Sequence, residues 1–157
     1  MRVLLDTSSL IYLSDFRKFE EIFTVDSVVR EVRDKNTAMK LSVLKLKIVE
    51  ADEKIIGEVI GIARQTGDLE KLSRTDIEVI AAAKQFDCTI ISDDRNIQNV
   101  AEKLGIKYIS IFSSRITKLI TWKNYCENCK KSYSRGKICP VCGASLKRVP
   151  ASSEEIK

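Results

Sequence analysis

The sequence predicts an α/β protein with a parallel sheet flanked by helices, followed by a small metal-binding module. Two apolar runs, Val3–Leu5 and Ile90–Ile91, each end close to an acidic residue and lead into a helical pattern, which is typical of buried parallel strands. A third short strand over 107–111 continues the alternation of strand and helix, which predicts right-handed crossovers. Two Cys-x-x-Cys pairs then follow near the C-terminus and indicate the module.

Length and composition are those of an ordinary globular protein. The chain has 157 residues, of which 44% are apolar, with only 2 Pro and 6 Gly. This is enough for one sizeable core and a small accessory module. The start of the sequence resembles no secretion signal, and no apolar run approaches the ~18 residues of a transmembrane helix, so we expect a cytoplasmic location.

Charge is distributed unevenly along the chain. Residues 1–114 carry 17 Lys and Arg against 19 Asp and Glu, whereas residues 115–148 carry nine basic residues and one acidic residue. The basic segment therefore predicts binding to a polyanion. The chain contains no histidine, which removes the commonest general base, so catalysis would depend on carboxylates.

The first half of the chain predicts helices on either side of a short edge strand. The first helix follows Asp6, and a second begins at Asp26 or Ser27, with Glu31 at the border of its apolar face. That face consists of Val25, Val28, Val29 and Val32. A further helix is expected over 37–44 and a short edge strand over 46–50.

Three helices are expected in the region from residue 52 to residue 105. The first begins after Asp52 and ends at Gly67. The second has a Thr-x-x-Glu capping box at Thr75 and Glu78 and is apolar on nearly every side, so it should be buried, with Asp76 facing packed structure. The third follows Asp94 and ends at Gly105.

The C-terminal region divides less clearly. The pattern from residue 113 to residue 123 fits a helix or a strand equally well. We expect an α/β domain over 1–112, a linker over 113–122, a zinc-binding ribbon over 123–149 and a disordered tail over 150–157.

Four carboxylates are expected to converge at one edge of the sheet. Asp6 and Asp94 follow two strands that should be neighbours, while Glu31 and Asp76 come from helices near that edge. Like charges this close raise one another's pKa unless a cation neutralises them, and an oxygen-only set suits Mg²⁺ or Mn²⁺. The alternative is that each acid is an ordinary helix cap or a solvated helix residue.

The two cysteine pairs, with nine residues between them, predict a structural zinc site. The ligands would be Cys126, Cys129, Cys139 and Cys142. A redox or disulfide role is the alternative, although a chain without a secretion signal disfavours it. The fifth cysteine, Cys88, is interpreted as a small core residue.

Basic and aromatic residues surround this predicted zinc site. Basic side chains can follow phosphates while aromatic rings stack on unpaired bases, which predicts an RNA-binding surface. Its candidate residues are Lys123, Lys130, Lys131, Tyr133, Arg135 and Lys137. In the alternative interpretation the ribbon is merely solvated, and its aromatic rings shield the zinc.

Taken together, these motifs resemble the PIN-domain nucleases over residues 1 to about 110. The resemblance rests on Val3–Ser8, the helix of Glu31, Thr75–Ala83 and Ile90–Asp94, in the family's order. A PIN domain followed by a four-cysteine ribbon resembles, more narrowly, the archaeal Nob-one type of ribosome-assembly endonuclease. That resemblance implies cleavage of single-stranded precursor rRNA at the 3′ end of the small-subunit (16S) rRNA, with ribosome-assembly proteins as further partners.

The resemblance also implies roles for individual residues. Asp6, Glu31, Asp76 and Asp94 fall in the acidic set that holds catalytic manganese or magnesium. Thr7 and Ser92 fall beside that metal as hydroxyl groups, and Asp93 competes with Asp94 for the last acidic position. Two other functions are compatible with the motifs, namely a non-catalytic RNA-binding assembly factor and a toxin-type PIN ribonuclease, although the latter leaves the ribbon unexplained.

Overall fold

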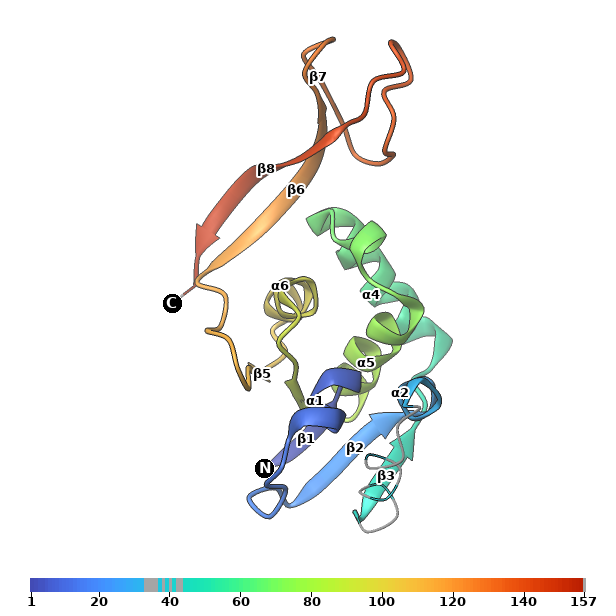
Figure 1. Cartoon of the computed structure of the whole chain (residues 1–157), viewed down its shortest axis with the longest axis vertical. Coiled ribbons are helices and arrows are strands. Elements are labelled where there is room, and N and C mark those ends of the chain that lie inside the picture. Colours follow the sequence, from blue (N-terminus) through green and yellow to red (C-terminus); the bar gives the residue numbers. More distant parts are fainter. Residues whose placement is uncertain (33–36, 38, 40, 42–43, 157) are drawn as a thin grey trace.

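The structure is a computed structural model that describes residues 1–32, 37, 39, 41 and 44–156. It consists of an α/β domain and a long antiparallel ribbon that extends from it (Figure 1). None of the helices in these described ranges is long and apolar enough to cross a membrane.

The α/β domain contains a parallel five-stranded sheet with the order β3-β2-β1-β4-β5. Its strands are β1 (Arg2–Leu5), β2 (Glu21–Val25), β3 (Leu46–Val49), β4 (Thr89–Ile91) and β5 (Tyr108–Ile109). Strand β1 is central, and its residues Val3, Leu4 and Leu5 are completely buried. The expected pairing of β1 with β4 is confirmed, with Leu5 opposite Ile91.

Helices pack on this sheet and complete the core. They are α1 (Thr7–Tyr12), α2 (Asp26–Glu31), α4 (Glu53–Thr66), the 3₁₀ turn η1 (Leu69–Lys71), α5 (Arg74–Gln85) and α6 (Arg95–Leu104). Helix α5 contacts β1, β2 and β4, and α4 and α6 pack beside it. Its residues 79–83 are all buried, which confirms the expectation of a helix enclosed on nearly every side.

Strand β2 was not predicted, because its last residue, Val25, was assigned to the face of the following helix. The run Glu21–Val25 is instead a buried strand beside β1. Thr24 interrupts its apolar pattern, but the Thr24 hydroxyl donates to the carbonyl of Leu5 at 3.0 Å and is thereby satisfied. The buried, hydrogen-bonded Thr24 thus made this strand hard to identify from its apolar pattern.

Helix starts also differ from the expected caps. In α5 the capping box is formed by Ser73 and Asp76, two residues before the predicted pair of Thr75 and Glu78. In α2, Asp26 lies inside the helix, and the N-cap residue Val25 provides no side-chain hydrogen bond. Predicted helix ends were more accurate, since Gly67 and Gly105 both terminate helices in the left-handed conformation.

The predicted helix over 37–44 lies largely outside the described residues. The neighbouring prediction of an edge strand over 46–50 is confirmed by β3, which occupies one edge of the sheet.

The ribbon is longer than expected. It consists of β6 (Lys118–Cys126), β7 (Lys131–Tyr133) and β8 (Lys147–Glu155), in the order β7-β6-β8. Much of the segment expected as a linker belongs to β6, and most of the tail expected to be disordered belongs to β8, so that Lys118 pairs with Glu155. Each of these segments lacks a buried face of its own, which is why neither was identified as a strand alone. Pro150, which has no N–H to donate, lies opposite Trp122 next to a register shift.

The ribbon is attached to the α/β domain by contacts that require close approach. The side-chain amide of Asn99 pairs with the backbone of Ile120, donating to its carbonyl at 2.7 Å and accepting from its N–H at 2.8 Å. At Gly67, a Cβ atom would lie only 2.5 Å from the carbonyl oxygen of Trp122. Glycine is therefore required here both by its φ of +74° and by the strand that covers it.

Candidate functional site

The candidate site is built at the carboxyl edge of the sheet, where β1 and β4 end side by side. Asp6 follows β1 and is buried, and its Oδ1 accepts the N–H of Ser9 at 2.7 Å. The hydroxyl of Ser8 donates to both Asp6 oxygens at 3.0 and 3.2 Å. Asp6 is therefore the N-cap of α1, and the start of that helix fixes the orientation of its carboxylate.

Asp94 has the equivalent position after β4, as the N-cap of α6. Its Oδ1 accepts both the backbone N–H and the side-chain amide of Asn96, at 2.7 and 2.9 Å. The predicted hydroxyl, Ser92, is buried and accepts the backbone N–H of Asp94 at 3.1 Å. Both hydrogen bonds that described residues donate to the Asp94 carboxylate go to Oδ1, so that these residues leave Oδ2 to a ligand.

Asp76 enters the same region from the first turn of α5. Its Oδ2 accepts the N–H of Ser73 at 2.7 Å. Partial burial raises the pKa of Asp76, and the negative charges of Asp94 and Asp6 raise it further, although hydrogen bonds with Ser73 oppose this. The negative charges of Asp94 and Asp6 therefore disfavour ionisation of Asp76.

Glu31, at the end of α2, is exposed and is connected to the site through Thr7. The Thr7 hydroxyl donates to Oε2 of Glu31 at 2.6 Å. Because Thr7 is the residue directly after Asp6, this bond fixes the end of α2 beside the start of α1. The two predicted hydroxyl residues therefore both hold acidic residues in place.

The donor set fits a hard divalent cation in its chemistry. Each of the three aspartates is oriented through a helix start, and oxygen ligands of this kind suit Mg²⁺ or Mn²⁺. Within the described ranges, however, the four cysteines are the only group of three or more acidic or cysteine side chains placed to hold a metal ion as they stand. A cation would have to draw the three aspartates together, and this would relieve the repulsion that raises the pKa of Asp76.

Asp93 faces a different part of the molecule from Asp94. Its Oδ1 accepts the backbone N–H groups of Ile111, Phe112 and Ser113 at 3.0–3.1 Å, and the hydroxyl of Ser113 at 3.0 Å. Although partial burial has the opposite effect, these hydrogen bonds lower the pKa of Asp93. The carboxylate of Asp93 thus holds the loop after β5.

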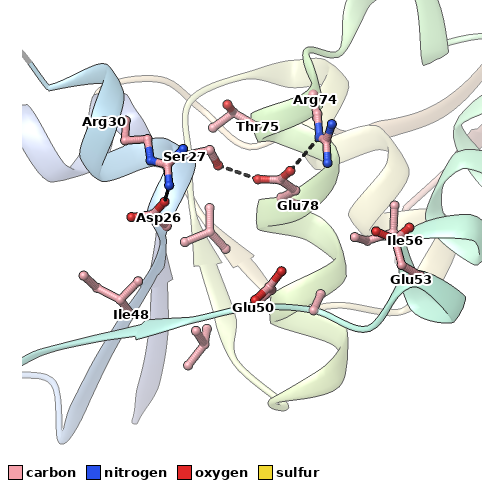
Figure 2. Close-up of a pocket in the computed structure, with 13 residues that line it drawn as sticks. Asp26, Ser27, Arg30, Ile48, Glu50, Glu53, Ile56, Arg74, Thr75 and Glu78 are labelled. Atoms are coloured by element: carbon pink, nitrogen blue, oxygen red, sulfur yellow. Dashed lines mark hydrogen bonds and ion pairs between the residues drawn. The ribbon is translucent and has the colours of Figure 1, made fainter.

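A cavity of about 670 Å³ lies beside the acidic edge, between α2, β3 and the start of α5 (Figure 2). Glu78 crosses it, accepting the Ser27 hydroxyl at 2.6 Å and the Arg74 guanidinium at 2.9 Å. None of the four predicted acids lines this cavity. The acids at the sheet edge therefore lie outside this cavity.

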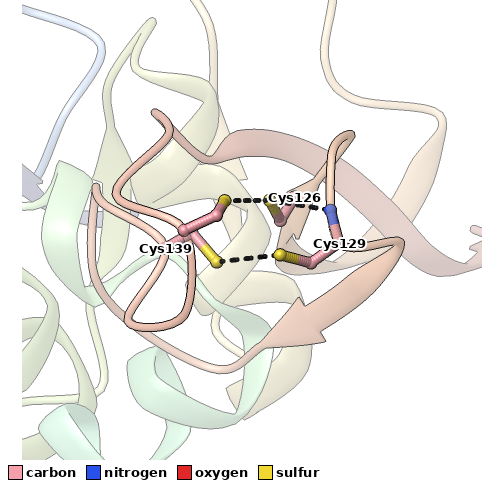
Figure 3. A group of neighbouring side chains, drawn as sticks. Cys126, Cys129 and Cys139 are labelled. Atoms are coloured by element: carbon pink, nitrogen blue, oxygen red, sulfur yellow. Dashed lines mark hydrogen bonds between the residues drawn. The ribbon is translucent and has the colours of Figure 1, made fainter.

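The four cysteines of the ribbon meet at one point (Figure 3). Their sulfur atoms all lie within 4.8 Å of one another, with 3.5 Å between Cys126 and Cys142 and 3.9 Å between Cys129 and Cys139. The N–H of Cys129 also donates to the sulfur of Cys126 at 3.4 Å. This group can bind a metal ion, and its closed set of four sulfurs fits tetrahedral zinc.

The candidate RNA-binding residues of the ribbon fall into two groups. Lys130, Lys131, Arg135 and Lys137 are exposed. Tyr133 instead directs its hydroxyl at the sulfur of Cys139, 3.5 Å away, so this ring lies against the cysteine group as the alternative interpretation expected. The hydrogen bond from Tyr133 lowers the pKa of Cys139 to about 6. Lys123 is half-buried on β6.

Sequence reasoning missed a buried polar cluster between the two parts of the molecule. Asp68 is fully buried and accepts Arg148 at 2.5 Å and Asn99 at 2.7 Å. The guanidinium of Arg148 also lies 4.3 Å from the ring centre of Trp122. Burial raises the pKa of Asp68, while hydrogen bonds with Asn99 and Thr66 and the charge of Arg148 oppose that rise. The sequence signal was an acid directly after the helix-ending Gly67, which resembles an ordinary turn.

Comparison with known proteins gives consistent matches. Residues 3–86 match a family model described as the PIN domain of ribonuclease. The chain is 35% identical over 157 residues to Endoribonuclease Nob1 of Pyrococcus abyssi, covering 96% of this chain and 94% of that protein. It is 38% identical over 138 residues to Endoribonuclease Nob1 of Archaeoglobus fulgidus, covering 83% and 82%. It is also 34% identical over 151 residues to Ribonuclease VapC1 of Thermoplasma acidophilum, covering 94% and 78%.

Proposed function

Because the chain belongs to the PIN-domain ribonucleases and is an endoribonuclease of the Nob1 type, we propose that its substrate is precursor rRNA of the small ribosomal subunit. The cut that we propose is the maturation of the 3′ end of 16S rRNA within single-stranded RNA. The basic ribbon is consistent with such a polyanionic substrate. Ribosome-assembly proteins are the proposed further partners, and the proposed location is the cytoplasm.

The observation that carries the proposal is the placement of Asp6 and Asp94 after the paired strands β1 and β4, near enough to Asp76 for their charges to raise its pKa. In the proposed mechanism these three residues hold manganese or magnesium. When bound, the cation would act as a Lewis acid that favours attack of water on the phosphodiester and stabilises charge on the phosphate. Of the adjacent acids 93 and 94, we assign the role to Asp94, because the carboxylate of Asp93 is already used by four donors of the loop after β5.

The chain's own hydrogen bonds prepare this site before substrate arrives. Ser8 and Ser9 donate to Asp6 and thereby orient its carboxylate. Thr7 fixes Glu31, whose exposed carboxylate completes the acidic set and orients the attacking water. The ribbon holds RNA through its exposed lysines and Arg135, with zinc as the structural ion of its cysteine group.

The test is cleavage of a short single-stranded RNA with manganese by Asp94→Asn. Loss of an outer hydrogen-bond partner at a metal site typically costs 10–100-fold, so loss of a proposed ligand should cost ~100-fold or more. The matched control is Asp15→Asn, an exposed acid outside the site. Undiminished cleavage by folded Asp94→Asn would remove this site from the mechanism.

The substrate is tested by incubating the wild-type chain with precursor rRNA and mapping the cut ends. Cuts at the 3′ end of the small-subunit rRNA support the proposal. Tight binding of this RNA without metal-dependent cleavage would instead identify a non-catalytic assembly factor, and cuts confined to other RNAs would favour a toxin-type ribonuclease.

A further inference from the structure

Two aromatic rings stand exposed beside the acidic edge. Tyr12 ends α1, the helix capped by Asp6, and Phe112 follows β5, the strand next to the one that leads to Asp94. Their ring centres are 5.7 Å apart in an edge-to-face arrangement. Tyr12 is 62% exposed and Phe112 is 72% exposed, so the pair has most of its surface in solvent. Large rings left this exposed at a site edge require an explanation.

The position of Phe112 is fixed by the backbone rather than by burial. Its N–H donates to both oxygens of Asp93, at 3.1 and 3.3 Å, and the adjacent N–H groups of Ile111 and Ser113 donate to the same carboxylate. Because Asp93 adjoins Asp94 in sequence, the loop that carries Phe112 has a fixed relation to the acidic site. An exposed ring held in this way is preorganised for a ligand.

Cations next to the pair indicate the class of ligand. Arg95 follows Asp94 directly, is exposed, and has no ion-pair partner within the described ranges. Together with Arg115 and Lys118 it lines a cavity of about 490 Å³ whose wall includes the chain just beyond Phe112. Aromatic rings beside this positive charge suit a nucleic acid whose bases are free to stack, whereas an apolar protein segment would leave the charge of Arg95 unmatched.

We propose that Tyr12 and Phe112 form a stacking platform for an unpaired RNA base next to the cleavage site, and that Asp93 is the positioning residue that holds this platform. The inference rests on the proposed RNA substrate, and it extends the specificity for single strands to the α/β domain itself. Bases in a duplex are already stacked on their neighbours, so duplex RNA cannot use the platform.

The first test measures RNA binding by the zinc-loaded full chain in the Asp94→Asn background. The probe is a single-stranded RNA carrying 2-aminopurine, whose fluorescence falls on stacking. Phe112→Leu and Tyr12→Leu should each weaken binding of this RNA about tenfold and reduce the quenching, because one stacked base contributes about that much. Phe112→Tyr should retain both properties, and duplex RNA should bind all variants alike.

The matched control is Ile48→Ala, an apolar residue that is 55% exposed at the opposite edge of the sheet. It should bind single-stranded RNA like the parent. Unchanged affinity and quenching in Phe112→Leu would overturn the platform and leave the pair as a protein contact. An equal loss for duplex and single-stranded RNA would also overturn it.

A double-mutant cycle tests the role given to Asp93. Asp93→Asn should weaken single-strand binding, and adding it to Phe112→Leu should cause little further loss, because both changes remove one interaction. Fully additive losses would overturn the positioning role. Cleavage by the wild-type chain separates this inference from the proposed function. If the wild-type chain cleaves RNA and Phe112→Leu binds single-stranded RNA normally, the platform is refuted and the proposed function is not.

Discussion

The acidic edge and the cysteine ribbon are both candidate cation sites, yet they are supported in different ways. At the acidic edge, backbone and hydroxyl donors hold Asp6, Asp76 and Asp94, and the core formed by β1, β4 and α5 lies behind them. In the ribbon, by contrast, the only buried residues between 118 and 156, all of which are described, are Cys126 and Cys139. The acidic edge is supported by the core of the α/β domain, whereas in the ribbon the cysteines themselves take the place of a core.

This difference predicts opposite consequences of removing the two cations. A domain with its own core retains its fold when a surface carboxylate site loses its ion. A module whose buried residues are the ligands depends on the ion for its folding free energy. The acidic edge should therefore lose chemistry without losing structure, and the ribbon should lose structure.

Removal of zinc should have the largest effect. Structural zinc in small modules contributes about 10–16 kcal/mol, so Cys126→Ser or zinc extraction should unfold the ribbon while the α/β domain stays folded. Trp122, the single tryptophan, lies on β6 and reports this change through its fluorescence. Its emission should shift to the red, and far-UV circular dichroism should retain the helical signal.

Unchanged Trp122 emission after zinc extraction would contradict this difference between the ribbon and the acidic edge. The control is zinc-loaded protein transferred into buffer without magnesium or manganese, which should keep both signals. Loss of the helical signal in that control would show that the acidic edge also needs its cation to fold.

Arg148→Met should have the next largest effect, on the contact between the two parts. It leaves the fully buried carboxylate of Asp68 without its cation, and an unpaired buried charge costs about 3–5 kcal/mol. The ribbon should detach, measured as independent NMR relaxation of the two parts. The control, Lys147→Met, removes the exposed neighbouring cation paired with Glu127 and should leave the parts attached.

Gly67→Ala should have a smaller effect of about 2 kcal/mol on the free energy of unfolding in denaturant, because the added Cβ meets the carbonyl oxygen of Trp122. Gly105→Ala is a close control, since Gly105 has nearly the same φ, +70°, but open space around its Cβ position. The difference between the two variants isolates the close approach of the ribbon. Equal destabilisation would contradict the docked arrangement.

Neutralising exposed cations on the ribbon should have the smallest effect. The triple change of Lys130, Lys131 and Arg135 to Gln should weaken RNA binding and lower the salt dependence of affinity by about 0.7 per lost phosphate contact. The matched control changes Lys54, Lys103 and Lys107, which are exposed on the α/β domain, to Gln. An unchanged salt slope in the ribbon variant would exclude the ribbon from phosphate binding.

The parts of the fold that sequence could predict were those with a strong local signal. The buried strands that lead to Asp6 and Asp94, the enclosed helix α5 and the four-cysteine group each carry a short-range pattern, and the structure contains all of them. Asp6 and Asp94, two of the acids predicted to form the site, are also helix N-caps, and Asp76 completes the capping box of α5. Capping and ligation were treated as alternatives, but a helix cap needs only one carboxylate oxygen, as Oδ1 of Asp94 shows.

The features that sequence could not predict depend on partners distant along the chain. Strand β8 forms because it pairs with β6, and the buried charge of Asp68 is satisfied by a residue 80 positions away, Arg148. Likewise, the use of Asp93 by the loop after β5 is visible only once that loop is placed beside it. Local sequence patterns do not indicate such distant pairings.

Binding of Mn²⁺ to the zinc-loaded full chain, measured by electron paramagnetic resonance, tests the central claim most directly. The account predicts that the wild-type chain binds Mn²⁺, that Asp94→Asn loses this binding, and that Asp93→Asn retains it. The loop after β5 uses both oxygens of Asp93, whereas the hydrogen bonds from described residues to the Asp94 carboxylate go to Oδ1. Equal Mn²⁺ binding by the wild-type chain and Asp94→Asn, or its loss in Asp93→Asn alone, would contradict the account.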